Sequence, residues 1–200
     1  MVEFDELLET LKRAAAVLRE AKVPFLLGGG LAAWARGGPE TEHDLDLMVK
    51  PEDAERALEA LSGAGFQTAR PPEGWLFKAW DGETLVDLIF CPSGGEVDDE
   101  MLARGEELDV HAVRMQVMAL EDVMVTKLLS MREHEVDYDN VLEIGRALRE
   151  QVDWHAVRSR TAQSPYARTF FFLAEELGVL EPVLSRPRAL RSVPSEQLDR

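Results

Sequence analysis

The sequence predicts an α+β protein, in which a mixed β-sheet flanked by helices is followed by a C-terminal helical module. Up to residue 119, short apolar segments alternate with glycine, proline and aspartate turns, a pattern typical of strands interspersed with helices. From Leu120 onward, apolar residues recur every three or four positions, as they do in helices. We therefore expect one domain over residues 1–119, a helical module over 120–185 and a flexible tail over 186–200.

The first half of the chain carries the strand signals. An amphipathic helix at residues 3–21 is predicted from the spacing of Phe4, Leu7 and Leu11. The next helices are expected where a glycine turn or Pro51 precedes a helical pattern, at residues 31–36 and 51–63. Short apolar or alternating runs predict strands at residues 23–27, 44–49, 66–69, 75–79, 84–90 and 110–118. The turn at residues 80–83 should join two of them as a hairpin.

The second half of the chain has a different pattern of apolar residues. The acidic stretch at residues 95–110 reads as a solvated loop and helix face. Helical periodicity then covers residues 120–133, 138–151, 154–162 and 166–180. Three prolines after residue 181 interrupt any regular structure, which is why the end of the chain is expected to be loose.

Composition and charge exclude several classes of protein. With 46% hydrophobic and 30% charged residues the chain is globular, and 200 residues bury about 70% of the unfolded surface. The net charge of −16 argues against a protein whose whole surface binds nucleic acid or an anionic membrane. From His155 onward, however, basic residues outnumber acidic ones. The single cysteine excludes an internal disulfide and favours a reducing cytoplasm. No apolar run approaches the length of a membrane span.

Three acidic residues are the candidates for chemistry. Asp44 and Asp46 lie two apart in a predicted strand, so both side chains point to the same face. Two such carboxylates can hold a pair of divalent cations, although most acidic pairs of this kind are simply solvated. Asp87 stands in an otherwise apolar strand, where a charge is costly unless it is paired or metal-bound. A solvated strand face is its alternative explanation.

The turn at Gly28-Gly29-Gly30 lies ahead of the acidic pair. Glycines let backbone N–H groups approach a phosphate closely, and a helix that begins after them adds its positive end. A plain turn from strand to helix is the alternative interpretation of these glycines.

The combined pattern is apolar-Gly-Gly, a spacer, Asp-apolar-Asp-apolar and a lone acid on a later strand. It resembles the nucleotidyltransferase superfamily of the polymerase-beta type, on the residues Gly29, Gly30, Asp44, Asp46 and Asp87. Residues 29–32 and 41–47 look most like two branches, the aminoglycoside and lincosamide nucleotidyltransferases and the abortive-infection or toxin–antitoxin nucleotidyltransferases. The second branch is also suggested by a helical lysine, Lys127, that is followed by acids at Asp137 and Asp139.

The resemblance implies a mechanism. Asp44 and Asp46 would hold two Mg²⁺ (or Mn²⁺) ions, and Asp87 would ligate one ion and take the proton of an attacking hydroxyl. The nucleotide would contact Gly29, Gly30 and Thr41, and Lys127 would reach the leaving phosphates or else be an ordinary surface lysine. Many relatives have an arginine just before this threonine, where Pro39 and Glu40 stand here, and Arg36 is the candidate substitute.

The resulting expectation is a cytoplasmic enzyme that moves an NMP from an NTP to a hydroxyl and releases pyrophosphate. Small molecules, tRNA and proteins remain open as acceptors, and the acidic charge disfavours tRNA. A toxin–antitoxin component with a cognate protein partner fits the second branch. The alternative is a non-catalytic binding or antitoxin-type protein of the same fold, against which the intact acidic set argues.

Overall fold

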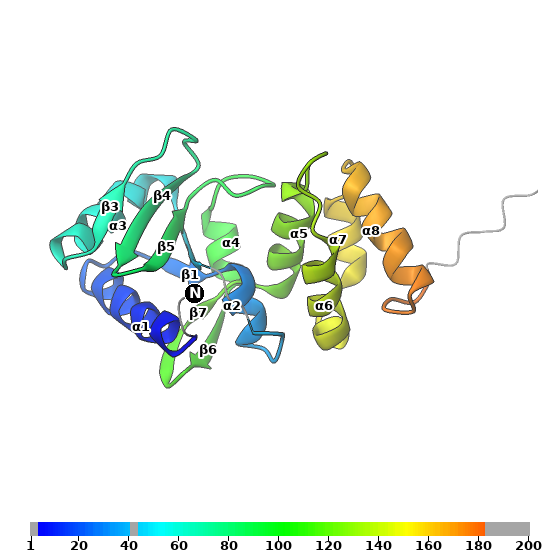
Figure 1. The fold of residues 1–200 in the computed structure, drawn as a ribbon, viewed down its shortest axis with the longest axis horizontal. Coiled ribbons are helices and arrows are strands. Elements are labelled where there is room, and N and C mark those ends of the chain that lie inside the picture. The colour runs from blue at the N-terminus through cyan, green and yellow to red at the C-terminus, as the bar shows by residue number, and fades with distance from the viewer. Residues whose placement is uncertain (1–3, 41–43, 183–200) are drawn as a thin grey trace, which may run out of the picture.

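The computed structural model describes residues 4–40 and 44–182 (Figure 1). One mixed sheet has the strand order β3-β4-β5-β2-β1-β7-β6. Its strands are β1 (Phe25–Leu27), β2 (Leu45–Val49), β3 (Gln67–Ala69), β4 (Leu76–Asp81), β5 (Thr84–Ile89), β6 (Glu106–Val110) and β7 (Val113–Val117). The α+β class expected from the sequence is confirmed.

The centre of the sheet brings distant parts of the chain together. Strand β2 pairs antiparallel with β1 and parallel with β5. Strands β4 and β5 form the predicted hairpin, closed by the pair Asp81–Thr84. Leu27, Leu45 and Leu47 have no exposed surface, so the middle strands are held by burial on the inner face.

Two helices cover the sheet beside its β3-β4-β5 end (Figure 1). They are α1 (Phe4–Glu20), which buries Leu8, Leu11 and Leu18, and α3 (Pro51–Gly63), which starts with Pro51 at its first turn. Two short helices, α2 (Gly29–Trp34) and α4 (Asp99–Arg104), follow strand β1 and precede strand β6.

The C-terminal half is helical, as predicted. It contains α5 (Leu120–Ser130), α6 (Tyr138–Leu148), the 3₁₀ segment η1 (Arg149–Gln151), α7 (Trp154–Arg160) and α8 (Pro165–Glu176). These helices share an apolar core of their own around Phe170 and Phe171. Ala33 of α2 is buried in that second core although its helix belongs to the sheet half, so α2 joins the two halves. The division into domains at residue 119 stays a prediction.

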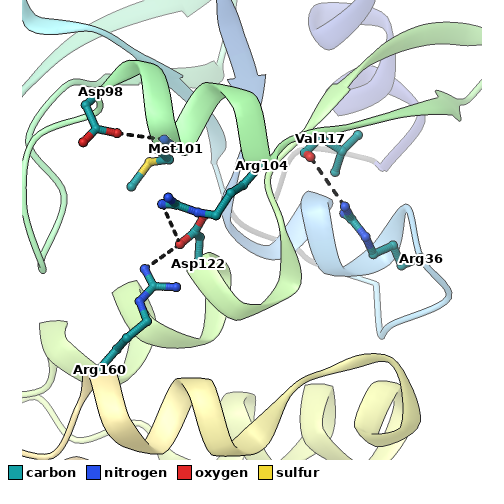
Figure 2. A network of polar contacts seen from close by, with 7 residues as sticks. All are labelled: Arg36, Asp98, Met101, Arg104, Val117, Asp122 and Arg160. Atoms are coloured by element: carbon teal, nitrogen blue, oxygen red, sulfur yellow. Dashed lines mark hydrogen bonds and ion pairs between the residues drawn. The ribbon is translucent and has the colours of Figure 1, made fainter.

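A buried ion-pair network also connects the halves (Figure 2). The carboxylate of Asp122 in α5 is fully buried. It accepts from Arg104 of α4 at 2.9 Å and from Arg160 of α7 at 2.5 Å. A buried charge is tolerable only when it is paired in this way, so the network fixes α4, α5 and α7 against one another.

Several predicted boundaries are corrected. Residues 106–110, expected in an acidic loop or helix face, form strand β6. This strand lies at the edge of the sheet and pairs with β7 alone, so its acidic side chains stay exposed to solvent. The strand expected at 110–118 is correspondingly shorter, since its start turns back through His111 and Ala112 at positive φ. Helix α2 starts at Gly29 rather than at residue 31, and α5 ends at Ser130. The expected tail at 186–200 lies outside the described residues.

Candidate active site

The strand register places three charged residues in one row. Asp46 of β2 is paired with Asp87 of β5, and Asp87 with Lys78 of β4. Residues paired across neighbouring strands project from the same face of a sheet, so the row runs from lysine to two carboxylates. On the side of Asp46, the row of charged residues ends at the glycine turn. There the backbone N–H of Gly28 donates to the carbonyl of Asp46 at 2.8 Å.

Gly29 lies directly against the carboxylate of Asp46. Its φ of +56° is in the left-handed region that favours glycine. A β-carbon built there would stand 1.7 Å from Oδ2 of Asp46. No other residue fits this position unless the carboxylate moves, so the glycine and the acid form one structural unit.

Asp44 is exposed just ahead of β2, two residues before Asp46. Burial is the main cause that raises the pKa of Asp46 and of Asp87, and the charge of Asp44 adds to both shifts. Asp46 and Asp87 are thus neighbours across two strands, and Asp44 precedes the first of these strands. Their roles remain proposals.

Burial and mutual repulsion disfavour ionised acids at this site. Burial, and then the Asp87 carboxylate, raise the pKa of Asp46 to about 7, against the opposing pull of Lys127. Burial also raises the pKa of Asp87, while Lys78 opposes it. The ammonium of Lys78 is 3.4 Å from Oδ1 of Asp87, a buried oxygen that has no hydrogen-bond partner among the described residues.

These features fit a cation. An unsatisfied buried carboxylate oxygen next to a second carboxylate offers the oxygen ligands that Mg²⁺ prefers. Across residues 4–40 and 44–182, however, no group of three or more His, Cys, Asp or Glu side chains already stands close enough to hold a metal ion. Asp44 would have to approach its two partners for a three-carboxylate site to form.

A cleft of about 900 Å³ opens between the sheet and the helical half. Gly29, Asp46 and Trp75 line it from the sheet side. Lys127 and Asn140 line it from the helical side. Burial lowers the pKa of Lys127, and the carboxylates of Asp46 and Asp137 oppose this shift. An acid and a lysine thus face a common space from opposite halves of the protein.

The remaining predicted residues have varied positions. Gly30 is half-buried in the first turn of α2, and Thr41 lies outside the described residues. Asp137 lines the cleft and caps α6 by accepting from the backbone N–H of Asn140 at 3.1 Å. Asp139 is exposed.

Arg36, the candidate substitute for the missing arginine, serves the fold. Its guanidinium is 3.4 Å from the carbonyl of Val117 (Figure 2), and its side chain is only 6% exposed. It is also absent from the lining of the cleft. The expectation that Arg36 contacts phosphate therefore has no support from its position.

Sequence reasoning missed Lys78, Trp75 and Asn140. Lys78 was within reach, because a two-residue hairpin loop at Gly82 and Glu83 fixes every pair down to Lys78–Asp87. Trp75 is 39% exposed at the cleft, and Asn140 has a buried side-chain oxygen without a hydrogen-bond partner in the described residues. Neither feature leaves a signal in sequence spacing.

The family of the chain follows from a comparison with known families. Residues 5–185 match a family described as uncharacterised nucleotidyltransferases. The chain belongs to this nucleotidyltransferase family. The predicted superfamily and the predicted class of enzyme, which transfers an NMP, are both confirmed.

Solved structures with the same fold have distant sequences. The solution structure of the antibiotic-resistance factor ANT(2'')-Ia is 16% identical, with a TM-score of 0.61 over 86% of this chain and 96% of that one. The lincomycin-bound lincosamide antibiotic adenylyltransferase LnuA is 14% identical, with a TM-score of 0.50 over 76% and 97%. An antigenic nucleotidyltransferase-like protein from Paracoccidioides brasiliensis is 16% identical, with a TM-score of 0.50 over 86% and 88%. No curated protein matched.

No helix among the described residues is both long and apolar enough to cross a membrane.

Proposed function

We propose that this nucleotidyltransferase moves an NMP from an NTP to a hydroxyl of a small molecule, with a divalent metal at Asp44, Asp46 and Asp87. The observation that carries the proposal is the row of charged residues beside the glycine turn, which meets a cleft lined by Lys127 from the other side. A space of about 900 Å³ has the size of a small-molecule site.

The fold relatives support the choice of acceptor. ANT(2'')-Ia was solved in complex with adenylyl-2''-tobramycin, and LnuA with lincomycin. The acidic surface of this chain, at −16, also favours a small molecule over RNA. A protein hydroxyl and tRNA, which a toxin–antitoxin component would modify, are the competing acceptors. The single cysteine fits the reducing cytoplasm as the place of action.

The proposed roles follow from position. Asp46, paired with Asp87 across the strands, would hold the metal, with Asp44 closing the site. A bound divalent cation would neutralise phosphate charge and stabilise the attacking and leaving oxygens. Gly29 has no side chain, so the Asp46 carboxylate can stand directly against its backbone at the edge of the cleft. Lys127 supplies a positive charge from the opposite wall.

The proposed transfer exchanges one phosphorus–oxygen bond for another at the α-phosphate. The acceptor hydroxyl oxygen bonds to the α-phosphorus, the bond from that phosphorus to the bridging oxygen breaks, and pyrophosphate leaves. The hydroxyl proton goes to the carboxylate of Asp87. A carboxylate whose pKa is raised by burial is a better proton acceptor than an ordinary aspartate, which suits this assignment.

A labelling experiment tests the proposal. The purified chain is incubated with each α-³²P-labelled NTP, Mg²⁺ and one of three acceptor pools: a metabolite extract, total RNA or a protein extract. We expect label in the small-molecule pool and stoichiometric pyrophosphate. Asp46→Asn should abolish both, whereas Asp109→Asn, at an exposed position of β6, should leave both unchanged.

Other outcomes point elsewhere. Label in RNA or protein would replace the proposed acceptor class while leaving the reaction intact. An NTP that binds without any transfer, to any of the three pools, would favour the non-catalytic binding protein.

A further inference from the structure

We propose that Lys78 is the resident counter-ion of the acidic site: it holds Asp87 in place when no metal is bound and competes with the metal for that carboxylate. The inference rests on the proposed function, because it takes Asp87 to be a metal ligand. It makes Lys78 a positioning residue, and it predicts that removing this lysine tightens metal binding.

The geometry singles out this pair. Lys78 and Asp87 are directly opposite each other in the antiparallel β4–β5 hairpin. Their charged atoms are 3.4 Å apart, and the Asp87 side chain is only 13% exposed. Oδ1 of Asp87 receives no hydrogen bond from any described residue, so the ammonium balances its charge without saturating its lone pairs. That oxygen can still accept a metal ion.

A second lysine shows what an ordinary ion pair looks like in this protein. Lys50 lies 2.8 Å from Glu52 and 3.0 Å from Asp99, and these partners are 65% and 87% exposed. Water screens such a pair, so its loss changes little. Lys78 differs because its partner is buried next to a further carboxylate, Asp46. Lys50 is therefore a matched control.

Two consequences follow from placing one cation beside two acids. Without metal, loss of Lys78 leaves the buried Asp87 and Asp46 to repel each other, so the protein loses stability. With metal, the same loss removes a positive charge that repels the incoming ion, so affinity for the ion rises. A lysine that only supports the strand would produce the first effect and not the second.

The test uses the full chain and Mn²⁺ as the probe, with Lys78→Met, Lys78→Gln, Lys78→Arg and Lys50→Met. Thermal unfolding is followed in EDTA and in saturating Mn²⁺, and the dissociation constant for Mn²⁺ is measured by calorimetry. We expect both neutral variants to melt below the parent in EDTA and to recover most of the difference in Mn²⁺. Their dissociation constants should fall at least about threefold. Lys78→Arg and Lys50→Met should resemble the parent.

Each alternative result has one meaning. If the parent itself shows no response to Mn²⁺, the proposed metal-dependent function fails. If the parent responds but the neutral variants bind Mn²⁺ no more tightly, the role of Lys78 as a counter-ion is overturned and the function stands. Failure of both neutral variants to fold even in saturating Mn²⁺ also overturns it, because the metal should replace the ammonium.

Discussion

The carboxylate of Asp46 occupies the space that a side chain at Gly29 would need. Any β-carbon at Gly29 would overlap the carboxylate, and the backbone there is left-handed. The sequence pattern pointed to a close approach between backbone and phosphate at this turn. The structure adds a reason within the protein itself, because the glycine is needed to let Asp46 stand where it does.

Gly29→Ala should therefore be costlier than its backbone strain alone. Gly37 is the control, since it also has a positive φ, of +91°, but no atom of another part of the chain lies within 4 Å of its would-be β-carbon. We expect Gly37→Ala to lower the free energy of unfolding by about 1 kcal/mol and Gly29→Ala by at least about 2 kcal/mol. Urea unfolding measures both, and equal losses would show that the contact with Asp46 does not matter.

The raised pKa of Asp46 makes stability depend on pH. The folded protein holds a proton on Asp46 up to about pH 7, whereas an ordinary aspartate releases it near 3.8. The folded state then binds more protons than the unfolded state between these values, so stability falls as pH rises through them. In EDTA, the parent should lose more free energy of unfolding between pH 5 and pH 8 than Asp46→Asn does. Parallel pH profiles for the two proteins would contradict this.

Single elements show what the sequence could and could not predict. The β4–β5 hairpin was predictable, because its turn residues and alternation are local. Strand β6 was not, because three exposed acids hide the alternation of an edge strand. The pairing of Asp46 with Asp87 joins residues 41 positions apart in the chain, and no local signal fixes which strands become neighbours. The three acids were thus identified as candidates, while the contacts of Asp87 with Lys78 and of Asp46 with Gly29 needed the sheet.

The contact of three helices at Asp122 also could not be predicted from the sequence, where this acid looks like an ordinary residue of a first helical turn.

Replacing Asp122 should destabilise the interface between α4, α5 and α7. Asp122→Ala leaves Arg104 and Arg160 without their buried partner, and we expect a loss of about 3–5 kcal/mol. Asp109→Asn, which weakens the exposed pair with Arg114 at 3.5 Å, should cost less than about 1 kcal/mol. Chemical denaturation of the two variants tests the contrast, and similar small losses would show that the network is dispensable.

At the scale of the whole molecule, the two halves of the protein each have an apolar core, and together they line one cleft. Each half contributes a charge to that cleft. Asp46 comes from the sheet and Lys127 from the helices, so binding of the proposed ligand would depend on how the two halves are held. The spacing of apolar residues predicted the change from strands to helices at Leu120. It could not predict the cleft, because a space between two halves is formed by long-range packing.

Lys127→Met should separate nucleotide binding from metal binding. Lys127 faces the cleft from the wall opposite Asp46, so its loss should weaken NTP binding by at least about tenfold, or 1.4 kcal/mol. Binding of Mn²⁺ alone should not weaken, because the proposed ligands all lie on the sheet side and the change removes a positive charge rather than a ligand. Calorimetry with a non-hydrolysable NTP and with Mn²⁺ gives both constants. Unchanged NTP affinity would return Lys127 to the status of a surface lysine.

Helix α2 begins at the glycine turn and contacts the helical half of the protein through Ala33. Gly29 at its start lies against Asp46, and Ala33, one turn further, is buried in the helical core. A helix this short has little freedom to bend, so a displacement at one end reaches the other. The fit of Gly29 against Asp46 therefore depends on packing in the helical core, at a residue that does not line the cleft.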